Sequence, residues 1–239
     1  MNLLKVFFPL LVIYLSGCAS APPRTDNKKH PPVSSELKIG SFVKTDIDTV
    51  TEIHQQESFE HLRVLMEKLY RRNPREWKKS GQPSLDAAME RAFDSRSDWR
   101  FPEFKGKRGA ECIYLAFDEK YQGDRVLAFI GGLASMIKLS YNDKMEFYVL
   151  DELDSQKLYN SARNVEIAVW KLSSTRDARG ELVLLSNEKE GASHNVSFER
   201  EFGKLIAQQD TIARIIAEKT NRTFVRAIQS VGTALFLPI

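Results

Sequence analysis

The stretch GDRVLAFIGGLASMIKLSYN, residues 123–142, carries the clearest structural signal in the chain. Its apolar residues recur at the spacing of one helix face: Val126, Ile130, Leu133 and Ile137. Asp124 lies just before this stripe, where a carboxylate stabilises the positive end of a helix dipole. The stretch therefore predicts an α-helix, and the fold has to supply partners for its apolar face.

A pair of glycines, Gly131 and Gly132, lies inside this predicted helix. Each glycine costs about 1 kcal/mol of helix stability relative to alanine. We expect either that another backbone packs very close at this point or that the helix kinks there.

Segments on both sides of this stretch show the same helical spacing of apolar residues. Ser84 is a candidate N-cap for one of them and Asp154 for another, and Asn73-Pro74 should end or kink the first. The segments are residues 57–72, 84–93, 155–174 and 197–220. The seam of the last one runs from Phe198 through Gln209 to Ile216, and the spacing continues at Phe224, Ile228, Val231 and Leu235.

These segments predict an all-α fold, a bundle of about five helices with antiparallel neighbours. The alternative is an α+β fold, because residues 112–117 and residues 146–150 could pair as a minor two-stranded sheet.

The N-terminus reads LVIYLSGCAS at residues 11–20. Residues 1–17 have the charged start, short apolar core and small-residue exit of a secretory signal peptide. Leu15-Ser16-Gly17-Cys18 resembles the bacterial lipobox, which implies cleavage before Cys18, a diacylglycerol on its sulfur and acylation of the new N-terminus. The alternative is a buried apolar segment with a chance cysteine.

The lipobox resemblance sets the expected domain organisation. Residues 18–50, rich in proline and polar residues, form a lipidated N-terminus and flexible tether, and residues 51–239 form a single helical periplasmic domain. Ala19-Ser20 lacks the aspartate that retains such proteins at the inner membrane. We expect an outer-membrane anchor with the protein on the periplasmic face, while an outward orientation stays open.

The composition narrows the class of partner. The net charge is +3 and the signs are mixed, which argues against nucleic acid. If Cys18 is lipidated, Cys112 is left without a disulfide partner, and its apolar surroundings indicate a buried, inert thiol rather than a nucleophile.

A basic cluster is the main candidate contact site. It comprises Arg71, Arg72, Arg75, Lys78 and Lys79 with Trp77 beside them. Such a cluster could contact anionic headgroups, lipopolysaccharide phosphates or peptidoglycan carboxylates, but it could equally be a solvated helix end.

Groups that could carry chemistry all have simpler interpretations. His54, Glu57 and His61 could share a helix face and hold a metal, but these residues could equally be ordinary exposed polar residues.

The carboxylates Asp118, Glu119 and Asp124 fit capping and solvation better than acid–base catalysis, as do Asp151 and Asp154. His194 stands alone. No nucleotide or hydrolase motif is present, so no catalytic residue, cofactor or metal is predicted.

Several stretches resemble a family of uncharacterised proteobacterial lipoproteins. They are KLYRRNPREW at 68–77, GDRV at 123–126, EFYVLDELDSQKLYNSARNVEIAVWKLS at 146–173, FGKLIAQQD at 202–210 and FLPI at 236–239. The resemblance covers residues 50–239 and agrees with the lipobox. It brings no known activity and no site residues.

Three functions follow as hypotheses. The first is a non-enzymatic, membrane-anchored envelope lipoprotein that acts through protein or envelope contacts. The second is a carrier or sensor of an apolar ligand, for which a cavity in the helical domain is required. The third is an envelope hydrolase with an unrecognised site.

Overall fold

The computed structural model describes residues 44–149, 151–187, 196–221 and 235–239. The chain divides into two units, residues 1–37 and 38–239, and every described residue belongs to the second. Cys18, the signal segment, most of the expected tether, His194, Phe224, Ile228 and Val231 lie outside the described residues.

The described part of the chain is built from helices, which confirms the all-α prediction. Within it the only strand-like pairing is one antiparallel bridge between Arg176 and Leu182. The helices are α1 (Asp46–Arg72), α2 (Glu76–Lys79), α3 (Leu85–Phe93), α4 (Ala110–Phe117), α5 (Arg125–Ser140), α6 (Ser155–Ser174) and α7 (Ser197–Thr220), with 3-10 turns η2 (Ser95–Ser97) and η3 (Pro102–Phe104).

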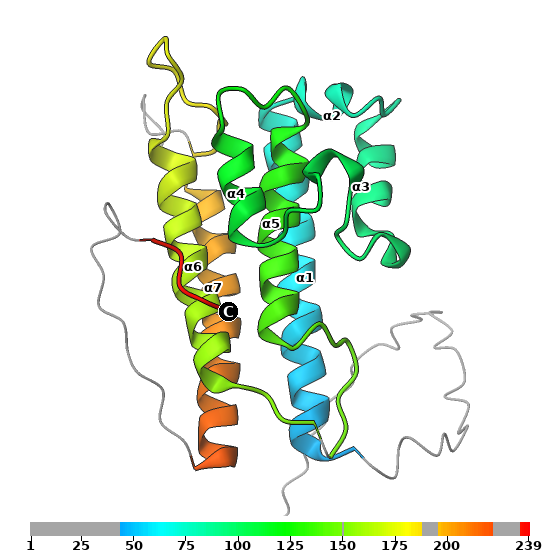
Figure 1. The fold of residues 1–239 in the computed structure, drawn as a ribbon, viewed down its shortest axis with the longest axis vertical. Helices are drawn as coiled ribbons and strands as arrows, with labels where there is room; N and C mark the ends of the chain where they lie inside the picture. The colour runs from blue at the N-terminus through cyan, green and yellow to red at the C-terminus, as the bar shows by residue number, and fades with distance from the viewer. Residues whose placement is uncertain (1–43, 150, 188–195, 222–234) are drawn as a thin grey trace, which may run out of the picture. The chain divides into compact units, whose positions relative to one another are not determined.

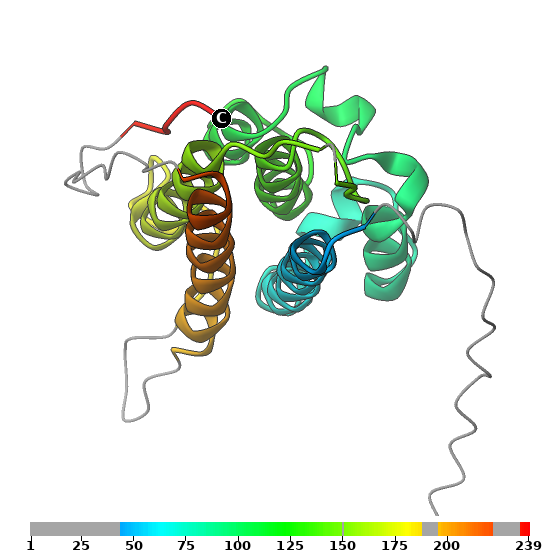
Figure 2. The same ribbon diagram turned by 90° about the horizontal axis from the view of Figure 1, so that it is seen from below.

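Helices α1, α5, α6 and α7 form a closed ring in which each packs on the next and α7 packs on α1. Figure 1 shows α1 and α6 running in one direction and α5 and α7 in the other, and Figure 2 shows α4 beside α5 outside the ring. Antiparallel neighbours are what short connections favour. Helix α5 is buried along nearly its whole length, so it forms the centre of the core.

Helix α1 begins earlier than the sequence indicated. The expected helical body started at Thr51, but α1 begins at Asp46 and so takes in the last residues of the predicted 18–50 tether. The cause is a capping box, in which Thr45 accepts from the Asp48 N–H and the Asp48 carboxylate accepts from the Thr45 N–H.

The α+β alternative is wrong for the described residues. Residues 112–117 belong to helix α4, which buries Cys112, Ile113 and Ala116 against the core. Residues 146–149 form a loop, because the Phe147 N–H donates to Glu52 at 2.8 Å and the Tyr148 N–H donates to Asp151 at 3.0 Å. Carboxylates therefore take the backbone donors that a strand ladder would have used.

Within the continuous helix α5, Gly132 marks a close approach of backbones, and Gly131 lies against an aromatic ring. A Cβ on Gly132 would lie 2.8 Å from the Ile113 nitrogen and 2.9 Å from the Gly109 carbonyl oxygen, and a Cβ on Gly131 would lie 2.8 Å from the Phe104 ring. Since backbone atoms cannot move aside as a side chain can, Gly132 allows α4 to pack on α5, while Gly131 leaves room for the Phe104 ring of η3.

Candidate ligand-binding cleft

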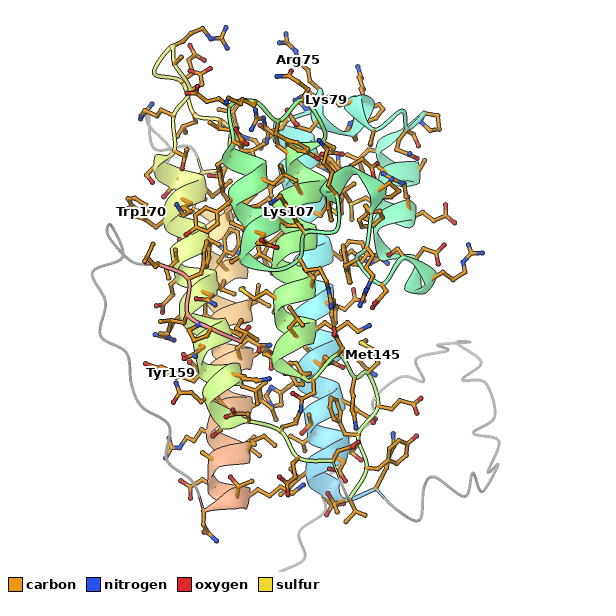
Figure 3. All side chains as sticks on the ribbon, viewed as in Figure 1. Arg75, Lys79, Lys107, Met145, Tyr159 and Trp170 are labelled. Atoms are coloured by element: carbon orange, nitrogen blue, oxygen red, sulfur yellow. The ribbon has the colours of Figure 1, made fainter. Side chains whose placement is uncertain are left out.

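An open cleft of about 280 Å³ lies between α1, α3, the loop after α3 and the loop after α5. Phe59 comes from α1, Phe93 from α3 and Trp99 from the loop after η2. Met145, labelled in Figure 3, comes from the loop after α5. The volume of the cleft is near the lower end of the range for small-molecule pockets. The cleft therefore suits a compact ligand or a single large side chain.

Aromatic rings build the floor of this cleft. The Trp99 indole is 8% exposed and lies nearly parallel to the Phe59 ring, with centroids 6.3 Å apart. Phe93 meets Trp99 edge-on at 4.9 Å. Such pairs add about 1 kcal/mol each beyond the area they bury, which stabilises this arrangement of the rings. Met145, in contrast, is 47% exposed and forms an adaptable rim.

The backbone that presents Trp99 is strained. Asp98 and Trp99 have φ angles of 47° and 55°, in the left-handed region that bulky residues rarely adopt. Each such residue costs roughly 1 to 3 kcal/mol and persists only where surrounding contacts hold it. Here the ring contacts of Trp99 and the ion pairs of Asp98 with Lys138 and Arg100 hold it.

Charged groups surround the aromatic floor. The Arg63 guanidinium lies 4.4 Å from the centre of the Phe93 ring. Burial alone would raise the pKa of Asp98, but hydrogen bonds from Lys138 and Arg100 outweigh burial and hold this pKa below its usual value. Asp98 is thus a paired anion. Arg63 presents a cation at the rim that can contact a polar end of a bound group.

The sequence analysis does not point to this cleft, because residues 94–111 have the proline and glycine content of a connecting loop. The signal within that loop was its aromatic content, Trp99, Phe101 and Phe104, all of which are buried. A loop with three large buried rings has to form part of a core or of a pocket.

The predicted carboxylates Asp118, Glu119 and Asp124 do not come together in one site. Asp118 and Glu119 are exposed, whereas Asp124 is buried and caps α5 by accepting from the Leu127 N–H at 2.9 Å. The Tyr70 hydroxyl donates to Asp124 at 2.8 Å and the Ser80 hydroxyl at 3.3 Å. Burial raises the pKa of Asp124 to about 6, and neighbouring Glu76 adds to the effect.

Asp154 is a confirmed N-cap of α6, since it accepts from the Gln156 N–H at 2.8 Å, and Ser84 caps α3 in the same way. Asp151 pairs with Lys144 and borders a second cleft of about 330 Å³, which Lys219 and Asp48 also line.

The basic cluster lies at the end of α1 and in α2. Arg71 pairs with Glu67 at 2.7 Å, and Lys79 pairs with the buried Glu76 at 2.7 Å. Trp77 packs partly buried against the core, while Arg75 and Lys78 are exposed. Figure 3 shows Arg75 and Lys79 near each other at one end of the helices. Contact with an anionic surface through this cluster stays a prediction.

The two histidines among the candidate metal ligands contact side chains of α7 instead. His54 bonds to Gln208 and His61 pairs with Glu201 at 3.2 Å, so both histidines join α1 to α7, while Glu57 is exposed. Among the described residues, no group of three or more potential ligands is placed to hold a metal. Cys112 is a buried free thiol, as expected, and burial raises its pKa to about 12.

Comparisons with family models, with curated proteins and with solved structures found no match. Within the described ranges, none of the helices is both long enough and apolar enough to cross a membrane.

Proposed function

We propose that this protein is a lipid-anchored binding protein of the bacterial cell envelope. In this proposal Cys18 carries the lipid, the outer membrane holds the anchor, and the helical domain acts in the periplasm through contacts rather than catalysis. The lipobox-like sequence Leu15–Cys18 supports the anchor. Several acyl chains on one residue give stable anchoring, whereas one chain alone gives only marginal binding.

The aromatic cleft is the observation that carries the binding role. Its floor of mutually packed rings, the exposed methionine at its rim and the cation over Phe93 are features of a pocket that accepts a partner's apolar side chain. The ring contacts of Trp99 and the ion pairs of Asp98 hold the strained backbone, and with it the indole, in place before the partner arrives. Pre-organisation of this kind lowers the entropy cost of binding.

Site-specific crosslinking in the native envelope tests this proposal. A photo-reactive residue at Met145 should give one reproducible crosslinked product, and the same residue at exposed Lys204 on α7 should not. Arg63→Ala removes a rim contact on an exposed side chain and should weaken the Met145 product several-fold. Equal products at both positions, unaffected by Arg63→Ala, would contradict a partner site in this cleft.

The second candidate function is a carrier or sensor of an apolar ligand, and the same cleft favours it. Native mass spectrometry of the purified chain distinguishes the two. A bound mass of a few hundred daltons that organic solvent extracts, and that Phe59→Ala abolishes, supports the carrier. Its absence together with a Met145 crosslink to a protein supports the partner site.

A further inference from the structure

The last residues of the chain lie across α6, as Figure 1 shows for the red segment. The backbone of this segment, Leu235–Ile239, bonds to two asparagines of α6. The side chain of Asn164 donates to the Leu237 carbonyl at 2.9 Å and accepts from the Leu237 N–H at 2.6 Å. Asn160 donates to the Pro238 carbonyl at 2.8 Å.

These contacts form a recognition pattern for an extended peptide. In an extended residue the N–H and C=O point to the same side, so one amide side chain can bond both, as a neighbouring strand would. Asn160 and Asn164 lie four positions apart on one face of α6 and therefore meet successive residues of the segment. Asn164 is 1% exposed, so both of its bonds are shielded from water.

The proline fits this pattern. Pro238 has no N–H to leave unpaired, and only its carbonyl is used. A proline also restricts the preceding residue to extended conformations, which is the form in which Leu237 offers both of its groups. Residue-proline is thus the dipeptide best suited to the two asparagines.

Two side chains of the segment, Phe236 and Ile239, pack against the core. Phe236 meets the Tyr114 ring of α4 edge-on, with centroids 5.1 Å apart. The next residue toward the N-terminus, Leu235, is 74% exposed. The segment is therefore held by three side-chain-to-backbone bonds and two apolar side chains, contacts that another extended peptide of the same form could make.

The aromatic surface continues beyond Phe236. Tyr114 is 43% exposed and Trp170 is 37% exposed, and the Lys171 ammonium lies 4.9 Å from the first ring and 5.9 Å from the second. Figure 3 shows Trp170 at the surface of α6. Part of each ring is therefore accessible to a bound peptide.

We propose that this surface, formed by Asn160, Asn164, Tyr114 and Trp170, is a binding site for an extended peptide of a partner protein. The peptide carries an aromatic residue followed by a residue-proline pair, and the chain's own C-terminal segment occupies the site when the partner is absent. The site is separate from the Trp99 cleft. Its asparagine amides form hydrogen bonds with the peptide backbone, and Tyr114 contacts the aromatic side chain.

Fluorescence anisotropy with a labelled peptide of sequence ALFLPI tests this proposal on the full chain carrying Cys18→Ala. The chain's own wild-type C-terminal segment should compete with the labelled peptide for the site, because a tethered segment acts at roughly millimolar effective concentration. Phe236→Ala weakens that competitor. We expect the peptide to bind the Phe236→Ala chain about tenfold more tightly than the chain with Phe236.

Two changes identify the contacts. Asn164→Leu, added to Phe236→Ala, should weaken peptide binding about tenfold or more, with circular dichroism showing the helices intact. A peptide methylated on the N–H of the residue before proline tests the same bond without touching the protein, and should also bind about tenfold more weakly. The proposal is overturned if the methylated peptide binds equally well, or if the helical Phe236→Ala chain binds no peptide.

Discussion

At the scale of single residues, Asp124 connects charge to stability. Its carboxylate caps α5 and accepts from Tyr70, yet it is 1% exposed. Burial raises its pKa from 3.8 in the unfolded chain to about 6 in the fold, which means that the folded state takes up a proton more readily than the unfolded state. The difference corresponds to roughly 3 kcal/mol.

The sign of the resulting pH effect follows from this order. Where the folded state binds the extra proton, the free energy of unfolding falls as pH rises. The stabilising contribution is therefore fully present below about pH 4 and is lost as pH rises through about 6. Asp124→Asn keeps a capping group but does not titrate.

Urea denaturation at a series of pH values measures the effect. The stability of the wild-type chain relative to Asp124→Asn should fall between about pH 4 and pH 7, because only the wild type carries this group. Tyr70→Phe removes a hydrogen bond that favours the ionised form, so it should move the change to higher pH. A stability difference that stays constant over this range would contradict the burial argument.

At the scale of elements, the contact between α4 and α5 depends on Gly132. Gly132→Ala adds a methyl group 2.8 Å from the Ile113 nitrogen, so the helices must separate, and we expect a loss of about 1 to 3 kcal/mol in the free energy of unfolding. Denaturation followed by circular dichroism measures it.

Gly203 on α7 is the matched control. It is helical and exposed, and a Cβ there meets nothing within 4 Å. Gly203→Ala should therefore raise stability by about 0.5 to 1 kcal/mol through helix propensity alone. If Gly132→Ala raises stability as Gly203→Ala does, the proposed close packing of α4 on α5 at Gly132 is contradicted.

The long helices were predictable because each buries one continuous apolar stripe, as α7 does from Phe198 to Ile216. Helix α4 was ambiguous because its short apolar run suits a helix or a strand equally. In the structure this run is a helix that packs closely against Gly132 of α5. The aromatic cleft and the asparagine site could not be predicted, because each joins segments far apart in sequence, such as Asn164 and Leu237.

At the scale of the whole molecule, the proposed function joins an anchor to a binding domain. The anchor depends on Cys18, and the domain offers two surfaces built from its described residues, the Trp99 cleft and the asparagine site on α6. Both surfaces place apolar groups next to polar ones, as contact sites between proteins do. A membrane anchor would raise the local concentration of envelope partners at both of them.

Intact-mass spectrometry of the membrane-purified protein tests the central claim most directly, with the wild type beside Cys18→Ala. The account predicts a wild-type chain that begins at Cys18 and carries the mass of a diacylglycerol and an acyl chain, whereas Cys18→Ala carries neither. If both chains show the same mass apart from the substitution, the protein is not lipid-anchored through Cys18, and the proposed function is contradicted.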